Sequence, residues 1–142
     1  MSKKRSGMVV KGSRHSYRLP GDPGVLAKMR QVPRRMWDEY SHLKVSTRIL
    51  LEKQHANKRA FSGPLFLEAA FYLPTKDVRG RRKLGEKQKP HVVRPDITDL
   101  VKFLEEVGSG IIFSNVCHIA GVHAYKVYDD EPRIEFSLVE LA

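Results

Sequence analysis

The chain has 142 residues, enough for one domain whose core needs neither disulfides nor a structural metal. Its single cysteine, Cys117, excludes an internal disulfide and offers no metal-binding spacing, so we expect a reducing, cytoplasmic setting. No apolar run approaches the roughly 20 residues of a membrane helix, and no long apolar stretch follows the basic start Lys3-Lys4-Arg5, so we expect a soluble protein without a signal peptide or a membrane partner.

Charge is the strongest compositional signal. The 26 Lys and Arg residues exceed the 16 Asp and Glu residues by a formal net charge of +10, and the isoelectric point is near 9.9. Such a surface attracts polyanions by neutralising phosphates and releasing counterions. Ribosomal and membrane-surface proteins can be equally basic, but the charge favours nucleic acid as the partner.

The first residues predict an arm and then a short strand. Residues 1–16 are rich in Lys, Arg, Ser and Gly, which predicts a flexible basic arm ahead of a domain at residues 17–142. The arm could contact phosphates or could simply be solvated. Residues 17–19 predict a strand, and the prolines and glycines at residues 20–24 predict a turn, because Pro fixes φ and Gly allows positive φ.

A helix and an apolar strand are predicted next. Apolar side chains recur at steps of three and four between residues 36 and 58, which predicts an amphipathic helix with a basic outer face. That face could be solvated or could contact DNA. Trp37 favours a core or interface position over a base-stacking role. Gly63-Pro64 ends this region, and residues 65–73 predict an apolar strand rich in aromatic side chains.

Residues 76–89 combine many basic side chains with glycines and show no apolar periodicity. A segment of this composition cannot order itself by burying apolar surface, so it predicts a flexible loop. Loops on a scaffold often carry binding residues, and this one could hold a phosphate backbone or could only aid solubility. The side chains predicted to bind nucleic acid are Lys76, Arg79, Arg81, Arg82, Lys83, Lys87, Lys89 and Arg94.

A second helix follows the loop. Pro95 favours an extended Arg94. Asp96 or Thr98 can then cap a helix at about residues 99–107, which glycines end. The predicted apolar stripe of this helix consists of Leu100, Phe103, Leu104 and Val107.

The remaining elements complete the predicted fold. Residues 111–113, Ile-Ile-Phe, predict a short buried strand. Residues 122–128 and 133–139 alternate polar and apolar side chains on either side of an acidic turn, which predicts a closing hairpin. The elements together predict an α+β fold: a single domain with a small mixed β-sheet, two main helices and a C-terminal hairpin.

Three stretches are arranged as in a known family. The stretch YRLPGDPGVLAKMR begins at Tyr17, RPDITDLVKF begins at Arg94, and GIIF is followed by a Lys-x-Tyr and Pro-Arg-Ile-Glu ending. This order resembles the RusA-type Holliday junction resolvases, which are crossover junction endodeoxyribonucleases. The most specific match is RPDITDLVKF, against the family pattern Pro-Asp-x-Asp-Asn-Leu-x-Lys-Phe. The resemblance implies a RusA-like domain over residues 17–142.

The family consists of Mg²⁺-dependent homodimers that bind four-way DNA and nick two opposed strands, with an active site of three aspartates and a lysine. The resemblance implies that Asp96 and Lys102 are catalytic, since both match. Thr98 stands at the second aspartate, and Asp99 stands at the asparagine that follows it. The third aspartate falls in the segment that begins with Asn115, at Val116. Two of the three acidic positions have therefore departed from the pattern.

These departures bear on the metal. Mg²⁺ prefers hard oxygen ligands, but Thr98 offers only a neutral oxygen and Val116 offers none. Asp99 could restore a ligand beside Asp96, although one step along a helix rotates a side chain by about 100°; it could instead compensate the helix dipole. Other candidate substitutes are Asn115, Glu105, Glu106 and His118.

Three hypotheses follow. The first is a RusA-like protein that binds branched or duplex DNA in recombination or repair, with nuclease activity weak or lost. The second is an active Mg²⁺-dependent endonuclease that uses Asp96, Lys102 and a relocated carboxylate such as Asp99. The third is a basic RNA-binding or assembly module that keeps only the fold. A homodimer is expected in the first two cases, because two-fold symmetry would match an open four-way junction.

Overall fold

The computed structural model describes the chain except residues 1–2, 6–7, 29–34, 36, 57 and 76–88. The elements are β1 (Lys3–Arg5), β2 (Met8–Pro20), α1 (Pro23–Ala27), α2 (Trp37–Gln54), β3 (Leu65–Pro74), α3 (Ile97–Gly108), the short 3₁₀ helix η4 (Val116–His118), β4 (Ile119–Asp129) and β5 (Arg133–Leu141). No described helix has the length and apolar character that crossing a membrane requires.

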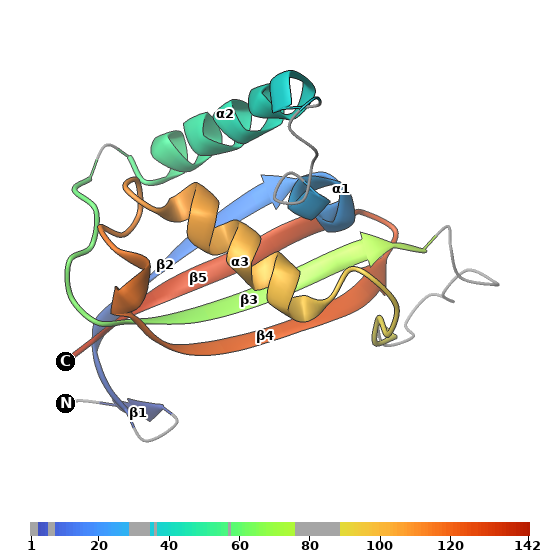
Figure 1. The fold of residues 1–142 in the computed structure, drawn as a ribbon. Coiled ribbons are helices and arrows are strands. Elements are labelled where there is room, and N and C mark those ends of the chain that lie inside the picture. The colour runs from blue at the N-terminus through green and yellow to red at the C-terminus, as the bar shows by residue number, and fades with distance from the viewer. Residues whose placement is uncertain (1–2, 6–7, 29–34, 36, 57, 76–88) are drawn as a thin grey trace.

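The strands form one mixed sheet in the order β1-β2-β5-β3-β4. The β2, β5 and β3 strands pair antiparallel, and β3 pairs with β4 in parallel. The three helices lie over one face of this sheet (Figure 1). The predicted α+β fold with a small mixed sheet and two main helices is therefore confirmed.

The core lies between α3 and the sheet. The four side chains of the predicted α3 stripe are at most 2% exposed, because residues three and four apart share one face of a helix. They pack in one cluster with the alternate residues of β3 that face the helices, among them Leu67 and Phe71. This packing fixes where α3 begins, at the end of the sheet where β3 finishes (Figure 1).

The predicted C-terminal hairpin is wrong. Strands β4 and β5 are antiparallel in direction, but β3 lies between them and pairs with both. Residues 130–132 therefore cross the end of β3, where the Thr75 hydroxyl donates to the Asp130 carboxylate at 2.7 Å. Alternation reveals which face of a strand is buried and does not reveal its neighbour. Because β3 is apolar on both faces, it takes the central position.

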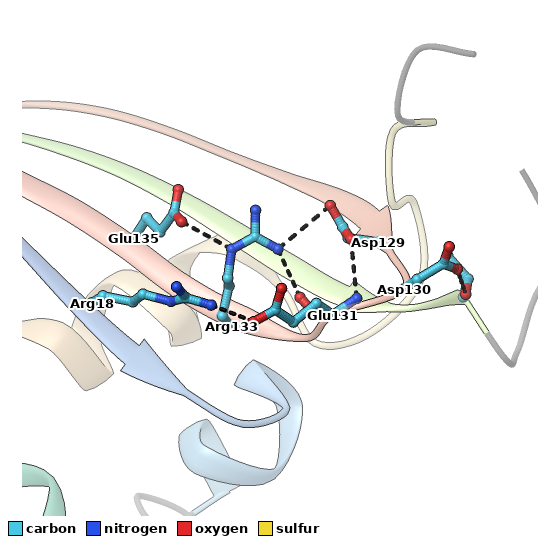
Figure 2. A network of polar contacts seen from close by, with 7 residues as sticks. Arg18, Asp129, Asp130, Glu131, Arg133 and Glu135 are labelled. Atoms are coloured by element: carbon cyan, nitrogen blue, oxygen red, sulfur yellow. Dashed lines mark hydrogen bonds and ion pairs between the residues drawn. The ribbon is translucent and has the colours of Figure 1, made fainter. Parts of the chain in front are cut away.

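Ion pairs hold this crossing in place (Figure 2). Arg133 of β5 binds the Glu135 carboxylate at 2.9 Å and the Asp129 carboxylate at 3.5 Å, and its guanidinium lies 3.8 Å from the centre of the Tyr72 ring. Arg18 of β2 pairs with Glu131 in the turn itself. Of these pairs, the one between Arg133 and Asp129 is the least exposed to solvent, while the pair of Arg18 with Glu131 lies on the surface, where ion pairs contribute little to stability.

Two other predicted boundaries differ from the structure. The boundary drawn at residue 16 between an arm and a domain falls inside β2, where Ser16 pairs with Ser137 of β5. Residues 111–113 are buried as expected, but they form a bend closed by hydrogen bonds to the Gly108 carbonyl, with Gly110 at φ +81°. The apolar run alone could not distinguish a buried bend from a strand.

Helix α2 ends at Gln54, four residues before the expected end. The next residue, His55, is buried, and its Nδ1 lies 2.7 Å from the Tyr17 hydroxyl while its Nε2 lies 3.0 Å from the Arg59 carbonyl. A carbonyl only accepts, so Nε2 carries the proton and Tyr17 donates to Nδ1. On the basic side of α2, Arg48 donates to the Ser109 carbonyl at 3.1 Å and so caps the C-terminus of α3.

Candidate active site

A cleft of about 740 Å³ lies at the N-terminal end of α3, between α1 and the segment that leads into α3. Its polar lining mixes acids and bases, with apolar side chains from α1 and the end of β3 between them. The ionisable residues that line the cleft are Asp22, Lys28, His91, Arg94, Asp96 and Asp99.

Residues 89–96, called the corner below, bring the chain from the outer edge of β4 to the start of α3. The backbone N–H of Tyr128 donates to the Lys89 carbonyl at 3.0 Å, and that of His91 donates to the Lys126 carbonyl at 3.0 Å. The peptide bond between Arg94 and Pro95 is cis. The corner is therefore fixed to β4 before it presents Arg94 and Asp96 to the cleft.

The side chain of Lys126 is the second attachment of the corner. Its Nζ donates to the carbonyls of Val93 and Pro95, each at 2.6 Å. Burial lowers the pKa of Lys126, and the nearby negative charge of Asp96 acts in the opposite direction. In the sequence, Lys126 is only the lysine of the Lys-x-Tyr ending, and no site role was predicted for it. A lysine that shares a strand face with the core-packed Ala124 is the signal that could have found it.

Asp96 and Asp99 lie on the same cleft. Asp96 occupies the N-cap position with extended dihedral angles, φ −72° and ψ 147°, but its carboxylate makes no capping hydrogen bond. Because the helix begins at Ile97, Asp99 follows Asp96 by three residues and projects on the same side. Thr98 and Asp99 both lie inside α3, one step apart, and of the two only Asp99 lines the cleft.

The described geometry can be compared with known proteins. The family model for the endodeoxyribonuclease RusA matches residues 23–138, from α1 to β5. The chain belongs to the RusA endodeoxyribonuclease family. It is also 26% identical over 98 residues to the Uncharacterized protein YqaN of Bacillus subtilis (strain 168), a match that covers 66% of this chain and 69% of that protein. The sequence-based resemblance is therefore confirmed, and the matched region contains every residue that lines the cleft except Asp22.

Other residues of the RusA pattern lie away from the cleft. Lys102 and Thr98 are exposed on α3, and neither lines the cleft.

Of the predicted nucleic-acid-binding side chains, Lys89 and Arg94 are exposed at the corner. Six others fall outside the described residues: Lys76, Arg79, Arg81, Arg82, Lys83 and Lys87.

Asn115 and Val116 lie at the far end of α3. The helix has twelve residues, which corresponds to about 18 Å, and the bend that follows its last residue leads directly into η4 (Figure 1). The Asn115 side chain accepts from the Cys117 N–H at 3.0 Å, and Val116 packs against the core. An acid at either position would therefore not reach Asp96 within one chain. Glu105, Glu106 and His118 do not line the cleft either.

Few of the described side chains could therefore serve as ligands for a metal ion at the cleft. Within the part of the chain that the structure describes, no three His, Cys, Asp or Glu side chains are grouped closely enough to hold a metal ion. The cleft offers Asp96 and Asp99, while the Asp22 carboxylate accepts from the Gly24 N–H at 2.9 Å and so caps α1. Two carboxylates can bind Mg²⁺ only together with water and substrate phosphate.

Proposed function

We propose that this RusA-family protein binds branched or duplex DNA in recombination or repair, as a cytoplasmic homodimer, with metal-dependent endonuclease activity that is weak or lost. The observation that carries the proposal is the charge balance at the cleft. Three acids, Asp22, Asp96 and Asp99, line the cleft against two bases, Lys28 and Arg94, and the ammonium of Lys126 interacts with Asp96 from outside the lining. A nearly neutral site concentrates a divalent cation poorly, whereas the whole chain carries +10 and attracts phosphate.

The family is typically Mg²⁺-dependent, so the fit of that ion matters. If it binds, Asp96 and Asp99 would hold it, and it would supply activation of water and stabilisation of charge on a phosphate. The cation of Lys126 beside Asp96 opposes this binding, because like charges repel. We therefore expect Mg²⁺ to bind weakly unless DNA phosphate adds negative charge to the cleft.

A second function is favoured by one specific observation. Asp99 lines the same cleft as Asp96, so the cleft holds a second acid beside the one that matches the family pattern. In that case the protein is an active structure-specific endonuclease in which Asp96 and Asp99 bind the metal and Lys102 contributes positive charge. Lys102 is exposed and outside the cleft, so it would act on a phosphate that lies across the surface of α3.

A binding and cleavage assay separates these functions. The substrates are a synthetic four-way junction, the matching linear duplex and single-stranded RNA, each with Mg²⁺ or Mn²⁺. The proteins are the wild type, Asp96→Asn, Asp99→Asn and the control Glu52→Gln, which removes an exposed acid of α2. The proposal predicts salt-sensitive binding that favours the junction over RNA, with no efficient nicking.

The other outcomes lead to different conclusions. Paired nicks that disappear in Asp96→Asn and Asp99→Asn, but persist in Glu52→Gln, would establish the active endonuclease. Equal or tighter binding of RNA would overturn the DNA proposal and support an RNA-binding module. Sedimentation with and without the junction would test the homodimer, because a one-to-one complex of monomer and junction contradicts it.

A further inference from the structure

The corner exposes two adjacent apolar side chains. Val92 is 83% exposed and Val93 is 57% exposed, the two highest values among the large apolar residues of the described chain. Single exposed valines are common, but a neighbouring pair at one tip presents continuous apolar surface. We call Val92 and Val93 the valine tip.

The valine tip is fixed on both sides. Before it, His91 is buried, its backbone N–H donates to β4, and its ring packs against Tyr128 with centroids 4.8 Å apart. After it, the Lys126 ammonium holds the carbonyls of Val93 and Pro95. The backbone of the tip is therefore ordered before any ligand arrives, which reduces the entropy lost on binding.

One exposed base flanks the valine tip on each side, and the exposed acid Asp96 stands at the end of the corner. The nearest exposed ionisable side chains along the corner are Lys89 on one side and Arg94 on the other, and Arg94 also lines the cleft. A second copy of this surface would bring like charges together, which disfavours a subunit contact here. Duplex and branched DNA instead offer phosphates for the two cations and apolar base faces for the valines.

We infer that the valine tip inserts into the opened base stack at the branch point of a DNA junction that lies across the cleft. Apolar side chains inserted between base steps must unstack them, and this costs least where the bases are already partly unstacked. The valine tip would therefore make the protein prefer branched DNA to linear duplex. This inference rests on the proposed DNA-binding function and adds the feature of DNA that is recognised.

The experiment uses a four-way junction with 2-aminopurine at the branch point, since the fluorescence of this base rises when it unstacks. The test variant is Val92→Ser/Val93→Ser, which keeps the charge of the corner and changes only exposed side chains. The matched control is Val45→Ser/Ile49→Ser, a pair on α2 that is 56% and 45% exposed. Affinities for the junction and for the duplex are measured at one fixed salt concentration.

The wild type and the α2 control should raise the fluorescence and prefer the junction. The valine-tip variant should lose the rise and bind the junction about tenfold more weakly, with duplex binding nearly unchanged. An unchanged junction affinity and fluorescence in this variant would overturn the inference while leaving DNA binding intact. If the wild type does not bind the junction, the proposed function itself fails. If the variant instead turns a dimer into a monomer, the tip is a subunit contact.

Discussion

Replacing Lys126 by Met tests whether this side chain holds the corner in place. Methionine keeps a flexible apolar stem of similar length but removes the ammonium that donates to the Val93 and Pro95 carbonyls. A hydrogen bond to a charged group contributes about 1.5–3 kcal/mol. Lys126 is half-buried, and the cost of desolvating its charge, which lowers its pKa, offsets part of this gain. We therefore expect a loss of about 2 kcal/mol for the two bonds together.

Urea unfolding measures the global loss, and amide hydrogen exchange locates it. The control Lys44→Met removes an exposed lysine of α2 and should change stability by less than about 0.5 kcal/mol. In Lys126→Met the N–H of His91, which donates to the Lys126 carbonyl, should exchange about tenfold faster or more. Equal unfolding midpoints for the two variants, with unchanged exchange at His91, would refute the role given to Lys126.

Three further predictions concern the core, pH and salt. Gly108→Ala should lower the free energy of unfolding in urea by about 1–3 kcal/mol, because the new Cβ would lie 2.7 Å from a ring carbon of Phe113. Gly63→Ala is the control, since a Cβ at Gly63 would meet no atom within 4 Å. Burial raises the pKa of Tyr17 from 10.0 to about 12. Between these two pH values the unfolded chain loses the phenol proton and the folded chain keeps it, so the free energy of unfolding should fall as the pH rises. Urea unfolding at several pH values should show a smaller fall in Tyr17→Phe. Junction affinity should fall steeply with added salt in titrations, and a flat salt response would contradict binding through phosphates.

Two stretches of the sequence were sufficient to predict which of their own side chains are buried, whereas the apolar steps of α2 were not, since Ile49 and Leu50 are exposed. The α3 stripe and the apolar run of β3 each encode which side chains are buried, because a 3.6-residue repeat and an unbroken apolar run are local properties of the chain. The RPDITDLVKF motif likewise carried the family resemblance from its residues alone. These features depend on neighbours along the chain, so one sequence contains them completely.

The tertiary structure decided which distant segments meet. It placed β3 between β4 and β5, and it brought Lys126 under the corner. It also gathered Asp96 and Asp99 at the start of α3 and left Val116 in η4, which follows the end of that helix. No local pattern encodes these pairings, because they follow from how the whole sheet buries its most apolar strand. The sequence therefore determined the family, the main elements and the charge, and the fold determined which of the candidate residues line one cleft.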